Sequence, residues 1–167
     1  MSATDPGDAD EEPADAEPAD WLVALRRDLH RHPEPAWREF YTTHRVIEAI
    51  ESLDIDDLTL HVGADALDLE ARSGVPEAAE LATWRERARG LGVPEERLEA
   101  LDGGHTGLVA RLRRGEGPHV AVRVDIDALP VTEAEDGAHL PASEGFRSEH
   151  EGFMHACGHD AHATIGV

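Results

Sequence analysis

The sequence contains no lysine, so all 15 of its basic residues are arginines. They are outnumbered by 36 acidic residues, and the 167-residue chain has a formal net charge of −21. Because an acidic surface repels the phosphates of nucleic acids and of anionic lipids, this charge excludes both as partners. We interpret the charge as a solvated surface adapted to high salt, rather than as an acidic binding patch. A salt-loving source is therefore expected.

Cysteine and long apolar runs are also scarce. Cys157 is the only cysteine, so no disulfide can form within the chain, and nothing in the sequence requires an oxidising compartment. No apolar run approaches the roughly 20 residues that a membrane-spanning helix needs. Met1 is followed by acidic residues instead of a basic and then apolar leader. These absences predict a soluble, cytoplasmic protein.

Aromatic residues make up only 4% of the chain, so any core must be built mainly from Leu, Val, Ile and Ala. The length suits one domain with a core of its own. Residues 1–20 contain eight acidic residues and three prolines but no basic residue. Such a segment cannot bury enough apolar area to offset its ordering entropy. We expect a disordered acidic tail over residues 1–20 and an ordered domain over residues 21–167.

Two amphipathic helices are predicted to open the ordered region. Asp20 is a good N-cap for the first helix, which has leucines at helical spacing and ends before Pro33. The second helix follows apolar residues at helical spacing from Trp37 to Leu53. It leaves a polar face for water, formed by Arg38, Glu39, Arg45 and Glu48.

The rest of the chain alternates between helical and strand patterns. Helices are predicted from Pro76 to Arg89, after Pro94, and from about Asp160 onward. Strands are predicted at Thr59 to Val62, and at Leu108 to Leu112 paired with His119 to Val124 through a turn at Arg114 to Pro118. The segment from Pro130 to Phe153 is predicted to be mostly irregular.

The segment HACGHDAH, residues 155–162, gathers five side chains that can bind or orient a metal. In an extended backbone the side chains of Cys157 and His159 lie on the same face, because strand side chains repeat every two residues. Gly158 between them allows the backbone to turn. A thiolate and an imidazole suit Zn²⁺ and other late divalent ions. We predict Cys157 and His159 as metal ligands, with His155, Asp160 and His162 contacting or orienting them.

Asp125 and Asp127 are also two residues apart, at the C-terminal end of the second predicted strand, so both can point into one site. Alternatively, this pair of acids caps nearby helices or faces solvent. A carboxylate behind a metal-bound histidine fixes its tautomer and raises its basicity. We assign this catalytic-site role to Asp125 and place Asp127 beside the ligands. His139 and His150 have no supporting spacing, and we expect them to be surface histidines.

Three segments, in chain order, resemble the metallo-amidohydrolases that include hippurate hydrolase and indoleacetyl-amino-acid hydrolase. They are LRRDLHRHP (residues 25–33), RVDIDALP (residues 123–130) and MHACGHDAH (residues 154–162). In that family the cysteine and the first histidine after it are metal ligands, which carries onto Cys157 and His159. The resemblance implies an α/β fold, in which the chain is the N-terminal part of a metallo-aminopeptidase-like catalytic domain with a mixed sheet and flanking helices.

The family's activity is hydrolysis of the amide bond of N-acyl amino acids by a water that two divalent ions activate, with Zn, Mn and Co as candidate metals. The resemblance places the general-base Glu and the remaining ligands after Val167, so we expect the fragment alone to be inactive and the full-length protein to be a homodimer. Within the family, residues 73–77 and 103–107 look most like the aminobenzoyl-glutamate hydrolase branch, which suggests that substrate.

Two other functions fit the same residues. Cys157 could be the nucleophile of a thiol hydrolase with His159 as its base. Nucleophile and base usually come from separate elements, which disfavours this interpretation. The segment could also be a non-catalytic metal-storage or metal-sensing module. A metallohydrolase is inactivated by a chelator and revived by metal, a thiol enzyme is inactivated by an alkylating agent, and a storage module has no turnover.

Overall fold

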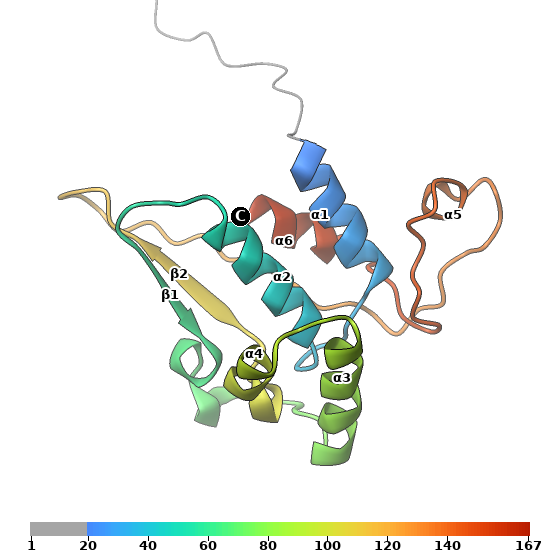
Figure 1. Cartoon of the computed structure of the whole chain (residues 1–167), viewed down its shortest axis with the longest axis horizontal. Helices are drawn as coiled ribbons and strands as arrows, with labels where there is room; N and C mark the ends of the chain where they lie inside the picture. The colour runs from blue at the N-terminus through green and yellow to red at the C-terminus, as the bar shows by residue number, and fades with distance from the viewer. Residues whose placement is uncertain (1–19) are drawn as a thin grey trace, which may run out of the picture.

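The computed structural model describes residues 20–167, so the predicted tail lies outside the described residues except for Asp20. Helices and strands both occur along this part of the chain, which confirms the α/β class. The elements are α1 (Asp20–Arg31), α2 (Phe40–Glu51), β1 (Leu58–Val62), α3 (Ala78–Gly90), α4 (Glu95–Ala100), β2 (Leu108–Leu112), α5 (Leu140–Ser143) and α6 (His159–Ile165), with 3₁₀ turns at Gly63–Ala66, Leu69–Ala71 and Asp102–Gly104. Figure 1 shows α1 and α6 together near the centre and the β1–β2 ribbon at one side.

The predicted opening helices are present, and the second is shorter than its apolar pattern. α2 begins at Phe40 because Trp37 has a φ of +66°, which a right-handed helix cannot include. The prediction that Glu39 lies on the water-facing side of this helix is wrong, because Glu39 is buried, with 6% of its surface exposed. Its side chain accepts a hydrogen bond from Thr106, a residue 67 positions away that no local pattern could have identified.

Two apolar clusters hold the helices together. In the first, Phe40 and Tyr41 of α2 pack with Trp84 and Ala88 of α3 and with residues around α4. In the second, Leu25 and Leu29 of α1 pack against Val46 and Ile50 of α2 and against Ala163 of α6. The second cluster therefore fixes α6 against α1 and α2, and α6 carries the chemistry-bearing histidines.

The strand pairing differs from the prediction. β2 pairs antiparallel with β1, with Leu60 opposite Ala110, and not with His119 to Val124. Within residues 20–167 the segment His119 to Val124 forms no strand, and Val120 and Val122 are 86% and 81% exposed. The valine-rich composition favours a strand, but a strand also needs a partner for its backbone hydrogen bonds, and none lies beside this segment in the described part of the chain.

The remaining predictions agree closely with the elements. α3 and α4 occupy the predicted helical segments, except that Pro76 and Pro94 lie before the first helical residue instead of inside it. The short helix α5 interrupts the segment predicted to be irregular. Among residues 20–167, no helix has both the length and the apolar character that crossing a membrane would require.

Candidate metal centre

The three motifs meet at one point of the fold. Ala128, in the middle motif, forms a parallel bridge with Pro35 and donates its N–H to the carbonyl of Glu34 at 2.7 Å. The next residue, Leu129, forms an antiparallel bridge with Met154, in which each residue donates to the other at 3.0 and 3.1 Å. The middle motif thus lies between the histidine-proline segment and the segment that leads into α6.

His159 is the first residue of α6, and its ring is fixed by Asp127. The Nδ1–H donates to the backbone carbonyl of Asp127 at 2.8 Å and to its carboxylate Oδ1 at 3.0 Å. A carbonyl oxygen can only accept, so the proton of the neutral ring is on Nδ1. The lone pair of Nε2 is therefore available to a ligand, as in metal-bound histidines. Gly158, with a φ of +76°, makes the turn that starts the helix.

The carboxylate that contacts the ring of His159 belongs to Asp127, whereas we had given this position to Asp125. Asp125 instead forms an ion pair with the exposed Arg123 at 2.6 Å. The prediction assumed that a strand would turn both side chains the same way. Residues 119–127 form no strand in the described structure, so this alternation does not apply.

Cys157 lies in the turn before α6 and its thiol is exposed and free. His162, one helical turn after His159, is also exposed, and the two rings stack with centroids 5.1 Å apart. The predicted soft donors are therefore accessible from solvent on the same short stretch of chain.

His155 and Asp160 are buried, at 4% and 0% exposure. Both ring nitrogens of His155 and the Oδ1 oxygen of Asp160 lack a hydrogen-bond partner among the described residues. Burial lowers the pKa of His155 to about 4, so this ring is neutral near pH 7. The other oxygen of Asp160 accepts from His30 of α1, so Asp160 links α6 to α1.

The donor set fits a divalent metal of the zinc type. His159 contacts Asp127 through Nδ1 and leaves Nε2 available, Cys157 presents a free thiol, and His162 adds a second accessible imidazole. Nevertheless, residues 20–167 contain no group of three or more His, Cys, Asp or Glu side chains already gathered to hold an ion. A catalytic zinc normally takes about three protein ligands, so these residues alone are too few for a complete catalytic site.

Two buried glutamates near this junction were not predicted from the sequence. Both oxygens of Glu34 accept from the first turn of α2, from the N–H groups of Tyr41 and Thr42 at 3.0 and 2.8 Å. Burial raises the pKa of Glu34 to about 7. Burial also raises the pKa of Glu39 to about 8, and the charges of Glu34 and Asp127 raise it further. Their only sequence signal was proximity to the histidine-proline motif.

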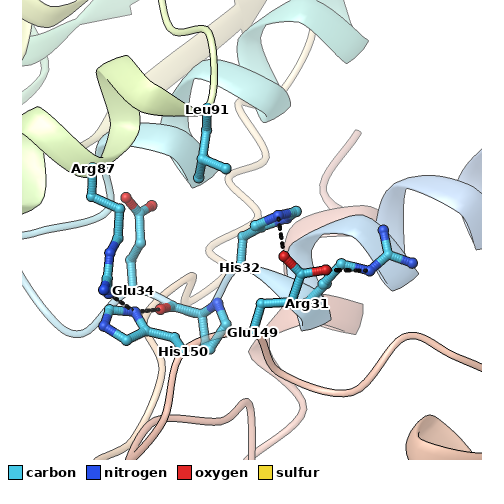
Figure 2. A pocket seen from close by; sticks show the side chains of 8 residues that line it. Arg31, His32, Glu34, Arg87, Leu91, Glu149 and His150 are labelled. Carbon is cyan, nitrogen blue, oxygen red and sulfur yellow. Dashed lines mark hydrogen bonds and ion pairs between the residues drawn. The ribbon is translucent and has the colours of Figure 1, made fainter.

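A pocket of about 110 Å³ lies beside the histidine-proline motif (Figure 2). In it Glu149 lies near the side chains of Arg31 and His32, and Arg87 reaches His150. None of the predicted metal ligands lines the pocket. His150 is not the surface histidine we expected: its ring packs on Trp84 with centroids 4.3 Å apart, and burial lowers its pKa to about 4.

His139 is likewise half-buried instead of on the surface. Its Nε2 lies 2.7 Å from Oε1 of Glu133, the same oxygen that lies 2.8 Å from Nε2 of His30. Glu133 is 3% exposed and also accepts from the backbone N–H of Ser148 at 2.6 Å. No spacing rule connects His30 with a glutamate 103 positions away, so this network could be found only in the folded chain.

Comparison with known proteins identifies relatives over most of the chain. Residues 121–167 match the family described as peptidase family M20/M25/M40. The chain is 48% identical over 147 residues to an indole-3-acetyl-aspartic acid hydrolase of Enterobacter agglomerans, covering 87% of this chain and 33% of that protein. It is 41% identical to one component of the p-aminobenzoyl-glutamate hydrolase of Escherichia coli (strain K12), with the same coverage of both chains.

A solved structure agrees with these matches. The crystal structure of an aminobenzoyl-glutamate utilization protein from Klebsiella pneumoniae superimposes with a TM-score of 0.61 and 42% sequence identity, over 66% of this chain and 28% of that one. The chain spans about a third of the length of the curated relatives it matches. It is thus similar to the hydrolases of peptidase family M20/M25/M40, which confirms the resemblance that its three motifs predicted.

Proposed function

We propose that the full-length protein containing this chain hydrolyses the amide bond of N-acyl amino acids, and that this chain supplies part of its metal centre. The observation that carries the proposal is the fixed ring of His159. Asp127 holds its Nδ1–H and leaves Nε2 free, two residues after an exposed thiol. The family match at residues 121–167 includes this segment, and relatives with hydrolase names match 87% of the chain, which supports amide hydrolysis as the reaction.

Cys157 and His159 would hold the metal, with His162 beside them. Two divalent ions, of Zn, Mn or Co, would supply Lewis-acid polarisation of the amide carbonyl and a lowered pKa for water. The chain's own contribution is orientation: Asp127 fixes the His159 tautomer, and buried Asp160 ties the first turn of α6 to α1. The general-base Glu and the remaining ligands are proposed to come from outside these 167 residues.

The substrate is proposed to join an aromatic acyl group to an acidic amino acid. The names of the two relatives describe amides of this form, indole-3-acetyl-aspartic acid and p-aminobenzoyl-glutamate. A substrate with two carboxylates needs cationic partners, and guanidinium groups bind carboxylates in a bidentate manner. Every basic residue apart from histidine in this chain is an arginine. We take p-aminobenzoyl-glutamate as the first compound to test.

We propose the cellular setting of the enzyme from its composition. A net charge of −21 and a single free cysteine support a reducing, salt-rich cytoplasm as its compartment, with no nucleic acid or membrane as partner. By the family resemblance, we propose a homodimer for the full-length protein.

The test is release of glutamate from p-aminobenzoyl-glutamate by metal-loaded full-length protein in high salt, beside indole-3-acetyl-aspartate, hippurate and acetyl-amino acids. Activity should disappear with a chelator, return with metal, and be absent in Cys157→Ser. Turnover of acetyl compounds alone would contradict the aromatic preference. Inactivation by an alkylating agent but not by a chelator would favour a thiol hydrolase, and no hydrolysis with a full metal complement would favour a storage or sensing module.

A further inference from the structure

His30 of α1 lies buried between two carboxylates. Its Nδ1 is 2.9 Å from Oδ2 of Asp160, and its Nε2 is 2.8 Å from Oε1 of Glu133. His30 is 4% exposed, and both carboxylate side chains are fully buried. Ionised carboxylates only accept hydrogen bonds, so both ring nitrogens must donate for the two contacts to be satisfied.

The contacts place a cation between two anions. Burial alone would lower the pKa of His30, but the hydrogen bonds to Asp160 and Glu133 outweigh it and raise the pKa above its ordinary value. Two further side chains face these carboxylates: Arg26 donates to Asp160 Oδ2 at 3.2 Å, and Nε2 of His139 lies 2.7 Å from Glu133 Oε1. A side chain with one donor could keep only one of the two bonds that His30 makes.

The network connects α1 with the residue beside the candidate ligand. Asp160 is the second residue of α6 and follows His159 directly. His159 is held on its other side by the carbonyl and carboxylate of Asp127. The first turn of α6 is therefore fixed from two directions, while Leu25, Leu29 and Ala163 pack the helix bodies together. Figure 1 shows α6 running beside α1.

We propose that His30 is a positioning residue: through Asp160 it fixes the first turn of α6, and so holds His159 with its Nδ1–H on Asp127 and its Nε2 free for a divalent metal. The proposal rests on the proposed function, in which His159 is a ligand. It differs from a purely structural role because it requires the ring of His159 to change when His30 is replaced.

His139 supplies a matched control. It contacts the same oxygen of Glu133 as His30 does, but it has no hydrogen bond to Asp160. His30→Gln and His139→Gln therefore both disturb the Glu133 end of the network, and only His30→Gln disturbs the Asp160 end. Any change in the His159 ring or in metal affinity that occurs only in His30→Gln therefore arises from the lost hydrogen bond to Asp160 in α6.

The experiment uses full-length protein labelled with ¹⁵N-histidine, with His159 assigned through a His159→Gln variant. Without metal, the ring shifts of His159 in the wild type should show the Nδ1–H tautomer. In His30→Gln the shifts should move toward a mixture of tautomers, and the affinity for added Co²⁺ should fall by about tenfold, as for other residues that orient metal ligands. In His139→Gln the ring shifts should stay unchanged, and the Co²⁺ affinity should stay within about twofold of the wild type, well below the loss expected for an orienting residue.

Unchanged His159 ring shifts in a folded His30→Gln protein would overturn the proposal. If that variant does not fold, Arg26→Gln tests the proposal instead. The Arg26 side chain is 46% exposed, so its replacement disturbs the core less, and it donates to the same Asp160 oxygen. It should move the ring shifts in the same direction by a smaller amount, and no movement would overturn the proposal. A wild-type protein that binds no Co²⁺ would refute the metal-dependent function, while the metal-free ring shifts would still decide the positioning role.

Discussion

The ring of His159 donates one N–H to two oxygens of a single residue, the carbonyl of Asp127 at 2.8 Å and its carboxylate at 3.0 Å. The carbonyl fixes the tautomer of the ring, and the carboxylate is a second acceptor for the same N–H, so the ring is held with Nε2 available to a ligand. Asp127 also lies next to Ala128, whose bridge to Pro35 anchors the middle motif. The orientation of the His159 ring is therefore set by a backbone junction as well as by a side chain.

Asp127→Ala should weaken Zn²⁺ binding by about 10–100-fold, because the carboxylate bond to His159 is lost while the carbonyl bond remains. The matched control is Asp125→Ala, which removes only an exposed ion pair to Arg123. Competition with a chelator of known affinity measures both variants in the full-length protein. Equal losses of Zn²⁺ affinity in the two variants would show that Asp125 also orients the metal-binding histidine, as we first predicted.

The local parts of this site could be predicted from the sequence, and its long-range parts could not. The start of α6, predicted near Asp160 and found at His159, follows from residues close together in the chain. Choosing between Asp125 and Asp127 required knowing whether that segment is a strand, which depends on a partner elsewhere. The contact between His30 and Glu133 spans 103 positions and has no periodic signal.

The fold shows the same division. The opening helices were predicted because apolar periodicity is a property of neighbouring residues, and α1 agrees closely with it. α3 was predicted from a proline near its start and a glycine near its end, which are also local signals. The pairing of β2 was predicted wrongly, because the nearest valine-rich segment was taken as its partner. The burial of Glu39 was also unpredictable, since its partner Thr106 comes from a distant loop.

Replacement of Gly63 by Ala should destabilise the fold more than replacement of Gly74. Both glycines have positive φ values, +66° and +71°, so each alanine costs about 1–2 kcal/mol of backbone strain. A Cβ at Gly63 would clash with the carbonyl oxygen of Ala100, whereas a Cβ at Gly74 meets nothing within 4 Å. The clash should add about 1–3 kcal/mol. Urea unfolding of both variants measures the difference, and equal losses would contradict it.

The melting temperature should rise with added chloride. The chain carries a net charge of −21, and screening reduces the self-repulsion that opposes compaction. Many ion pairs on the surface, such as Arg27 with Glu144, are weakened by the same screening, but each contributes at most about 1 kcal/mol. Thermal melts from low to molar salt test the balance. A melting temperature that is flat or falls with chloride would show that the ion pairs outweigh the net repulsion.

Glu39→Gln should stabilise the protein at alkaline pH and have little effect at acid pH. Burial raises the pKa of Glu39 from 4.5 to about 8, so the folded state keeps a proton that the unfolded state loses. The contribution of protonated Glu39 to the free energy of unfolding is fully present below pH 4.5. It is lost as the pH rises through about 8. Glutamine cannot ionise, and its amide oxygen can still accept the hydrogen bond from Thr106. The variant should therefore escape the loss.

The expected gain over the wild type is about 1–3 kcal/mol at pH 9, since one pKa unit corresponds to about 1.4 kcal/mol and relaxation around a buried charge reduces the full shift. Urea unfolding at pH 4, 7 and 9 measures it, with the exposed Glu70→Gln as control. The raised pKa of His30 also makes stability fall as the pH rises, but it is present in all three proteins and cancels in the differences. If the free energy of unfolding of Glu39→Gln followed that of the wild type at all three pH values, Glu39 would be ionised in the folded protein, and its burial beside Glu34 and Asp127 would need a compensating cation.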